Sequence, residues 1–389
     1  MKRFSYLGKH IFAITATLWA LTLVVTGVGC GSADDLTSGN KTYSFLDNKE
    51  SYVEKGLDID WGPGTSSLET ADVLILQVGT KVKRGKVVQA LNSHKPVAFV
   101  GEGSQDYLIA TLLNVEETEA RDAVSKGIPK PDDIEYSFGL EYGEPSNDYV
   151  AIASPHDTVL DIHLYSTNEP SHSYVLECLD KTFNRYSSGG LKSRASLGEE
   201  SNYLGFVHTE GEIQPYGKYK KFVLGYEAAD GYVPGHDRIG FEICQVIEPG
   251  CDIWDSNNWQ NDYIFRGFDF DENAGYEIVD YGPGDTQSQS KAQVSLSPGM
   301  SWSYTVSDVD IVASSDVTLE CVNWKHDVDR DAASAETGYI AEPGLIVQTL
   351  QGADPIVYQH NTQWQWFKDV GFWDRHQTHS THGPGTFYR

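Results

Sequence analysis

Four oxygen-bearing side chains in this 389-residue sequence have a spacing that could bind a metal ion. Asp269, Asp271 and Asn273 carry carboxylate or amide oxygens at alternate positions, and Asp280 follows where a closing ligand would stand. Ca²⁺ takes about six to eight oxygen ligands, and calcium loops present them at such alternate positions. The glycine comes one place later than in an EF-hand, and we expect strands rather than helices around it. The sequence therefore favours an acidic turn that faces solvent and no cofactor, with calcium bound by these four residues as the alternative.

The turn Gly101-Glu102-Gly103-Ser104 is a candidate anion-binding site, because it opens an expected helix. Backbone N–H groups at a helix N-terminus favour negative charge. The turn has neither the lysine of a phosphate loop nor the G-x-S-x-G pattern of a hydrolase. No catalytic residue can be named from the sequence, so an extracellular metal-dependent hydrolase ranks below a non-catalytic protein.

Three histidines, His376, His379 and His382, stand three residues apart near the C-terminus. On a helical turn this spacing brings imidazoles together, where they suit zinc or copper. Gly383-Pro384-Gly385 follows them, and chain termini are often poorly ordered. We therefore expect residues 374–389 to be a His-rich tail.

The N-terminus has the features of an export signal, with three basic residues before an uncharged run from residue 11 to 29. Cys30 follows as in a lipoprotein cleavage site, and its lipidation would anchor the protein to a membrane. The sequence departs from the lipoprotein motif at Gly27, which usually is Leu. Cleavage after Ala33 and an uncleaved anchor are the alternatives. Each of the three predicts an extracellular or cell-surface protein.

The remaining four cysteines allow disulfides, which persist outside the cytoplasm. Cys244 and Cys251 flank Ile247-Glu248-Pro249-Gly250, a turn-forming segment, and this predicts a disulfide across a short loop. Cys178 and Cys321 fall in different predicted domains, so we expect them to stay free.

A formal net charge of −27 indicates which partners to expect. Binding of nucleic acid or anionic lipid needs clustered Lys and Arg, so this charge argues against both. The expected partners are the membrane, through the N-terminal lipid or anchor, and an extracellular ligand that the sequence does not identify.

Strand and helix patterns alternate in the first half of the chain. Continuous apolar runs are typical of strands covered on both faces, and apolar residues at helical spacing predict the helices between them. The expected strands are 71–78, 95–100 and 158–165, and the expected helices are 83–93, 104–114 and 170–183. This order predicts a three-layer α/β domain with a parallel sheet. Its layout resembles a flavodoxin-like domain.

The second half consists of short β-rich runs between Gly, Pro, Asn and Asp clusters, after a Gly/Ser-rich segment. Such runs predict an antiparallel sandwich or barrel, so the fold class is α/β plus all-β. The predicted divisions are a signal (1–33), a tether (34–41), the α/β domain (42–186), a linker (187–202), the antiparallel β domain (203–373) and the tail (374–389).

The stretch from Asp285 to Val312 reads as a β-hairpin. Apolar residues alternate with serine or threonine on both sides of Ser297-Pro298-Gly299, so Val294 and Leu296 share one strand face, as do Trp302, Tyr304 and Val306. The hairpin gives the C-terminal half a resemblance to leukocidin-like β-pore-forming toxins, which would make it a membrane-inserting stem.

Two function classes follow from the sequence. The first is an exported cell-surface protein with a non-catalytic recognition or adhesion β domain, and the whole pattern resembles secreted archaeal surface proteins of no known function. The second is a β-pore-forming protein with its stem at 285–312. In the first arm, Thr286, Ser288 and Ser290 would have to face lipid, so the sequence favours the first class.

Overall fold

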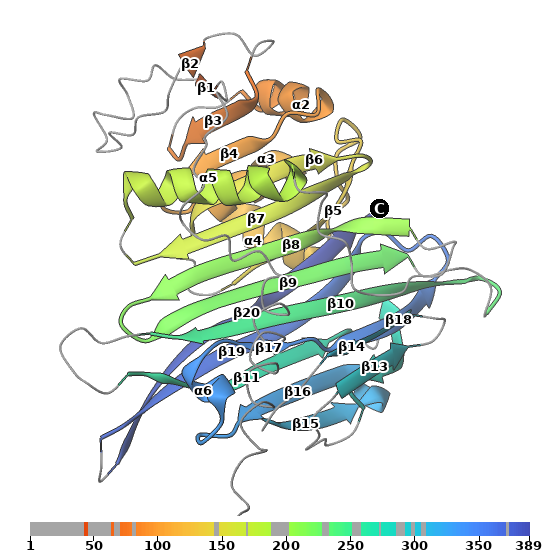
Figure 1. Ribbon diagram of the computed structural model, residues 1–389. Coiled ribbons are helices and arrows are strands. Elements are labelled where there is room, and N and C mark those ends of the chain that lie inside the picture. Colours follow the sequence, from red (N-terminus) through yellow and green to blue (C-terminus); the bar gives the residue numbers. More distant parts are fainter. Residues whose placement is uncertain are drawn as a thin grey trace, which may run out of the picture. The chain divides into compact units, whose positions relative to one another are not determined.

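The computed structural model (Figure 1) describes part of the chain. Its ranges are 43–45, 64–65, 71–79, 83–143, 148–168, 170–187, 202–227, 233–250, 258–271, 274–284, 292–296, 300–304, 309–370 and 373–389. The predicted signal and tether, with Cys30, lie outside these ranges. Residues 41–389 belong to one compact unit, to which all the elements below belong. In the described ranges, no helix is both long and apolar enough to span a bilayer.

The helices lie mainly in the first half, and strands make up most of the second (Figure 1). The helices are α2 (Arg84–Asn92), α3 (Ser104–Leu113), α4 (Ala120–Lys126), α5 (His172–Ser187) and α6 (Ala333–Glu336), with the 3-10 turns η2 (Glu117–Glu119) and η4 (Val317–Leu319). The strands up to the middle of the chain are β1 (Tyr43–Phe45), β2 (Gly64–Thr65), β3 (Val73–Gln77), β4 (Val97–Val100), β5 (Ser137–Glu141), β6 (Asp148–His156), β7 (Val159–Thr167), β8 (Asn202–Ile213), β9 (Gly217–Glu227) and β10 (His236–Pro249). The remaining strands are β11 (Gln260–Asp269), β12 (Glu277–Gly282), β13 (Ala292–Leu296), β14 (Met300–Tyr304), β15 (Val309–Asp316), β16 (Cys321–Val328), β17 (Tyr339–Ala341), β18 (Gly344–Leu350), β19 (Ile356–Asp369) and β20 (Asp374–Tyr388).

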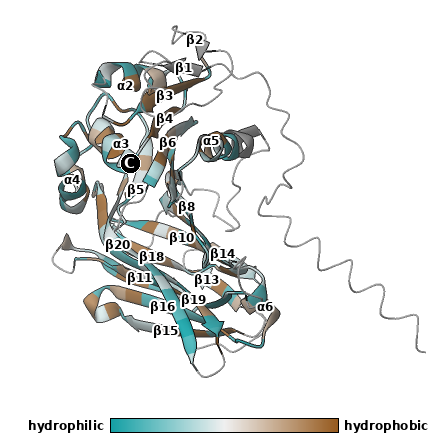
Figure 2. Ribbon diagram, turned by 90° about the vertical axis from the view of Figure 1, so that its left-hand side faces the viewer, coloured by the Kyte–Doolittle hydropathy of each residue, from teal (hydrophilic) through white to brown (hydrophobic). Residues whose placement is uncertain are grey.

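In the first half of the chain, helices lie on both faces of the strands. Figure 2 shows α2, α3 and α4 on one side of the strands and α5 on the other. Leu91 and Leu108 pack from the first side onto Phe99 of β4, while Val175 and Leu179 of α5 join a second core cluster on the opposite face. Continuous apolar strands are needed here because both sheet faces are covered.

The sheet is mixed rather than parallel. β3 and β4 are parallel, but β6 runs antiparallel to both β4 and β7. Only two residues join β6 to β7, and Asp157 among them takes a left-handed conformation with φ of 53°. A connection this short can join only antiparallel strands, which is the physical reason for the difference.

The sheet continues across the predicted linker. β7 pairs in parallel with β8, from Ile162 opposite Val207 to Thr167 opposite Glu212, although residues 188–201 between α5 and β8 lie outside the described ranges. The predicted α/β and β parts therefore share one sheet, which differs from the expectation of two separate domains.

The sheet divides at β7 into two wings. The first part of β7 pairs with β5, and the second part pairs with β8. From β5 the sheet runs through β20, β19, β11, β16 and β15, and from β8 it runs through β9, β10, β18 and β12. Phe241 of β10 lies 5.8 Å from Phe268 of β11 and 5.6 Å from Phe387 of β20, measured between ring centroids. The wings thus face each other across an aromatic core, as in a β-sandwich.

The predicted His-rich tail is wrong, because residues 374–388 form β20 and pair along their length with β19. In a strand, a spacing of three residues places side chains on opposite faces. His379 is mostly buried and lies 4.4 Å from the Tyr219 ring, whereas His376 faces Asp262 at 3.1 Å. The three histidines do not converge as a zinc or copper site would require.

Two buried histidines should make the sandwich sensitive to acid. Burial lowers the pKa of His326 to about 3, and burial together with Lys221 lowers that of His379 to about 4, from an ordinary 6.5. Below pH 6.5 the unfolded chain binds protons that the folded one does not, so stability falls as pH falls from 6.5 towards these values. At about pH 4.5, His326 alone should account for about 2–3 kcal/mol of loss.

The measurement is the free energy of unfolding in urea at about pH 7 and about pH 4.5 for the wild type and for His326→Gln. The variant should lose less stability over this interval than the wild type. The surface variant His94→Gln is the control and should follow the wild-type profile. An equally steep loss in His326→Gln would contradict the assignment.

Candidate functional site

The predicted hairpin exists, and it forms a sheet of its own. β13 and β14 pair in register, from Ala292 opposite Tyr304 to Leu296 opposite Met300, and within the described residues they pair with no strand of the main sheet. Figure 1 shows the hairpin beside β10 and β18 rather than in line with them. The hairpin therefore packs against a face of the main sheet.

The hairpin packs on glycines of the main sheet. A Cβ atom added to Gly344 would lie 2.2 Å from the Trp302 ring, and one added to Gly240 would lie 2.9 Å from the Met300 sulfur. The Trp302 Nε1–H also donates to the Glu342 carbonyl at 2.8 Å. Strand alternation places Gly240 on the face opposite to Phe241, which lies in the sandwich core. The hairpin therefore covers the outer face of the β10–β18 wing.

The hairpin is amphipathic, as its alternating sequence predicts. The side chains that face the main sheet are buried, and they are Ala292, Val294, Leu296, Met300, Trp302 and Tyr304. Gln293, Ser295 and Ser303 between them are exposed. The alternation changes phase after Tyr304, because Val309 and Ile311 are the buried residues of β15. The expectation of one strand arm from 300 to 312 is wrong, since β15 belongs to the main sheet and pairs with β16.

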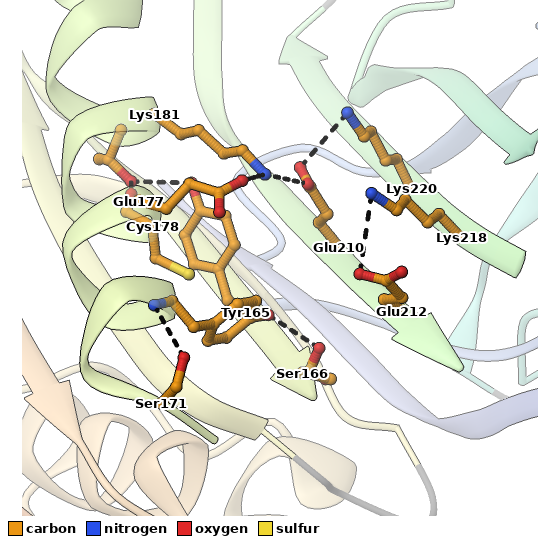
Figure 3. A network of polar contacts seen from close by, with 12 residues as sticks. Tyr165, Ser166, Ser171, Glu177, Cys178, Lys181, Glu210, Glu212, Lys218 and Lys220 are labelled. Atoms are coloured by element: carbon orange, nitrogen blue, oxygen red, sulfur yellow. Dashed lines mark hydrogen bonds and ion pairs between the residues drawn. The ribbon is translucent and has the colours of Figure 1, made fainter. Parts of the chain in front are cut away.

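A group of charged side chains lies between α5 and the strands β8 and β9. Figure 3 shows Lys181 reaching from α5 to Glu210 of β8, with Lys220 of β9 on the other side of the same carboxylate. The distances from Glu210 are 2.6 Å to Lys181 and 3.6 Å each to Lys220 and His208. Burial would raise the pKa of Glu210, but His208 and the two lysines lower it well below its ordinary value. These charges attach α5 to the sheet.

The most buried charges sit where the two wings face each other. Glu141 ends β5 and accepts from Arg266 of β11 at 2.5 Å and from Tyr358 of β19 at 2.9 Å. Its second oxygen lies 2.6 Å from Lys221 of β9, and all three charged side chains are at most 3% exposed. Burial opposes the charge on Glu141, but Arg266 and the other neighbours hold its pKa well below the ordinary range.

Sequence reasoning missed this ion cluster, although a signal for it exists. Lys221 stands inside the apolar strand segment 219–226, and Arg266 stands between apolar residues of β11. A charged residue in the middle of a two-faced buried strand needs a partner, because an unpaired buried charge is costly. Which partner it finds depends on strands far apart in the sequence.

The predicted anion-binding turn is present as a turn, but its surroundings oppose an anion. Gly101 and Gly103 take φ values of 126° and 78°, which glycine adopts without strain. The Gly101 N–H donates to Tyr149 O and the Ser104 N–H to Gly101 O, so both are already used. Burial, with Asp148 and Glu117, raises the pKa of Asp106 in the first turn of α3. The anion site, including Glu102, stays a prediction.

The predicted calcium ligands are partly described. Asp269 ends β11, Asp271 follows it on the surface, and Asp280 lies in β12, where its Oδ1 accepts from the next backbone N–H. Asn273 lies outside the described residues. In the described ranges, no three His, Cys, Asp or Glu side chains gather as a metal ion requires. Calcium stays a prediction.

The sequence predicts the Cys244–Cys251 disulfide across a short loop, but the structure has a strand there. Residues 244–249 belong to β10 and pair with β9, and in an extended strand they span roughly 16 Å. Cys251 lies outside the described ranges, so the pairing stays a prediction. Cys178 and Cys321 carry free thiols, as predicted, and burial raises the Cys178 pKa well above its ordinary value.

No family model and no curated protein matches the chain. Among solved structures it is similar to the Clostridium perfringens delta-toxin, with 9% identity, a TM-score of 0.36, and coverage of 49% of this chain and 94% of the other. A second structure, titled a pore forming protein, has 10% identity and a TM-score of 0.33 over 48% of this chain and 94% of its own. The membrane-inserted form of the Clostridium perfringens NetB toxin has 10% identity and a TM-score of 0.31 over 48% of this chain and 95% of its own.

These three structures belong to the leukocidin-like pore-forming toxins, the class that the hairpin sequence resembles. TM-scores below 0.5 do not establish a shared fold. The resemblance to archaeal surface proteins finds no match in sequence.

Breaking the buried ion cluster should destabilise the whole sandwich. Glu141→Gln leaves Arg266 and Lys221 with uncompensated buried charge, and such a loss typically costs about 3–5 kcal/mol. The midpoint of urea unfolding should fall accordingly. Asp122→Asn removes the partner of Lys126 in an exposed pair and is the matched control, with no measurable change expected. A Glu141→Gln variant as stable as the control would contradict the role assigned to the cluster.

Proposed function

We propose that this chain is a secreted β-pore-forming protein, and that its hairpin is a membrane-inserting stem stored on the outer face of the sheet. The observation that carries the proposal is the separate two-stranded sheet β13–β14, whose apolar side is buried on Gly240 and Gly344. Within the described residues, no strand pairing joins the hairpin to the main sheet. The hairpin is held by side-chain packing on a sheet face.

The two faces of the hairpin suit a membrane barrel. Transmembrane strands alternate lipid-facing apolar residues with polar residues that face the lumen. In β13 and β14 the buried side is apolar, and the solvent side carries Gln293, Ser295 and Ser303. Released from the sheet, the same pattern would turn the apolar side to lipid and the polar side to a water-filled lumen.

The length of the stem follows from the sequence around the two strands. The described strands have five residues each, and a transmembrane strand needs roughly 9–11. Residues 288–296 and 300–308 supply nine each, and both ranges precede β15, so the main sheet stays paired. Ser288 and Asp308 then fall at the ends of the span, where the membrane interface accepts polar groups, Thr286 lies outside it, and Ser290 is the one polar side chain of the first arm that would face the hydrocarbon.

Packing keeps the hairpin stored in water. Five large buried side chains, at about 1.5–3 kcal/mol each, oppose release by on the order of 10 kcal/mol. A lipid bilayer removes this penalty, because hydrocarbon tails replace the sheet as the apolar environment. Insertion is therefore expected at a membrane and not in free solution.

A disulfide that locks the hairpin to the sheet tests the proposal. A Cβ atom on Gly282 of β12 would lie 3.5 Å from the Val294 Cβ, within the separation that a disulfide requires. The double variant Gly282→Cys with Val294→Cys should release no dye from phosphatidylcholine–cholesterol liposomes when oxidised. Reduction should restore release, and the wild type should release dye under both conditions.

The reduced double variant and the single variant Val294→Cys are the matched controls, since each carries the new side chain without the cross-link. Release by the oxidised double variant equal to that of its reduced form would overturn the stem assignment. An absence of release by the wild type at micromolar concentration would overturn the pore function itself.

A further inference from the structure

A cleft of about 200 Å³ lies at the N-terminal end of α5, away from the hairpin. Thr167 ends β7 opposite Glu212 of β8, and α5 lies between these two parallel strands in the chain. The carboxyl ends of parallel strands are where open α/β sheets bind ligands. Figure 3 shows Ser166, Ser171 and Glu212 near this end of the helix. The cleft therefore occupies a position suited to a ligand.

Several side chains that line the cleft carry two hydrogen-bonding atoms each. Asn168 and Gln214 contribute amides, Glu177 and Glu212 contribute carboxylates, and Ser171 contributes a hydroxyl. Planar amides and carboxylates present two polar atoms each, a geometry that matches two neighbouring hydroxyl groups of a polyol. The set offers both donors and acceptors, as a ligand with many hydroxyls requires.

Tyr174 adds an aromatic ring held in one place. Its hydroxyl donates to the Ser166 carbonyl at 2.8 Å, and its backbone N–H donates to Ser171 Oγ at 3.2 Å. The hydroxyl is already bonded and the ring packs partly on the core under α5, so a ligand would meet the part of the ring that lines the cleft. An aromatic ring beside polar groups accommodates a molecule that is apolar on one side and polar at its edge.

The charges in the cleft favour a neutral ligand. Glu177 lies 2.8 Å from Lys181, and Glu212 lies 3.7 Å from Lys218, so each carboxylate has a lysine partner outside the lining. Among the described residues, no cationic side chain lines the cleft, which disfavours an anion, and the two lysines reduce the attraction for a cation. The volume is below the roughly 300–1,000 Å³ of sites that enclose a drug-sized molecule, so it suits one small ring.

We infer that this cleft binds a single neutral sugar ring, with its edge on the amides and carboxylates and its apolar face on Tyr174. The inference does not depend on the hairpin, because dye release measures insertion and sugar binding measures the cleft. Either result can fail while the other holds.

The experiment is saturation-transfer NMR and calorimetry on the full chain with three probes, the methyl glycosides of mannose, galactose and N-acetylglucosamine. At least one should bind with a dissociation constant in the millimolar range, as a site of this size allows. Gln214→Ala should weaken that binding about fivefold, the effect of one neutral hydrogen bond, and Tyr174→Ala should weaken it more than Tyr174→Phe, which keeps the ring.

Gln89→Ala, an exposed substitution on α2, is the matched control and should bind as the wild type does. Melting temperatures of all variants show whether each is folded, and Gln214 is exposed, so its substitution should leave the fold intact. Binding of none of the three glycosides would overturn the inference. So would binding that Gln214→Ala and Tyr174→Ala leave unchanged, or displacement of the sugar by inorganic phosphate or choline.

Discussion

The cluster of Glu141, Arg266 and Lys221 is the interaction on which the arrangement of the sheet depends. After β7 the sheet divides, and its two wings face each other across aromatic and aliphatic side chains whose burial is largely non-directional. Packing alone would tolerate small shifts between wings, whereas a fully buried carboxylate with two cations has one satisfactory geometry. The cluster draws on β5, β9 and β11, so it ties strands of both wings to one point.

A firmly closed sandwich also explains how a hairpin can rest on its surface without being part of it. The outer face of β10 and β18 has glycines where β14 approaches, and they leave room for large side chains such as Trp302. β10 pairs with β9 and β18 and faces the sandwich core on its other side, so these strands do not need the hairpin to hold the two wings together. Hydrophobic packing is non-directional, and an apolar hairpin face can exchange a protein surface for lipid without losing a hydrogen-bond ladder to the sheet.

The cleft beside α5 lies where the helix-containing half of the chain meets β8 of the second half. The charged pairs around Glu210 attach the middle of α5 to β8 and β9, and the Tyr174 hydroxyl bonds the first turn of the helix to the end of β7. The cleft at that end and the hairpin farther along the same wing, on β10 and β18, are two surfaces with different chemistry. One is polar and almost neutral, and the other is apolar and covered.

The sequence by itself determined the local features, because strand alternation, helical spacing and two-faced apolar runs are written in neighbouring residues. It predicted the helices α2, α3 and α5, the β-rich second half and the amphipathic hairpin. Only the tertiary structure decided the antiparallel insertion of β6, the continuation of one sheet through both halves, and the place of β20 in it. It also decided that Glu141 meets Lys221 and Arg266, about 80 and 125 residues away, and that β13–β14 lies on a sheet face rather than at its edge. These outcomes depend on which distant segments pair and pack, and no local periodicity encodes that choice.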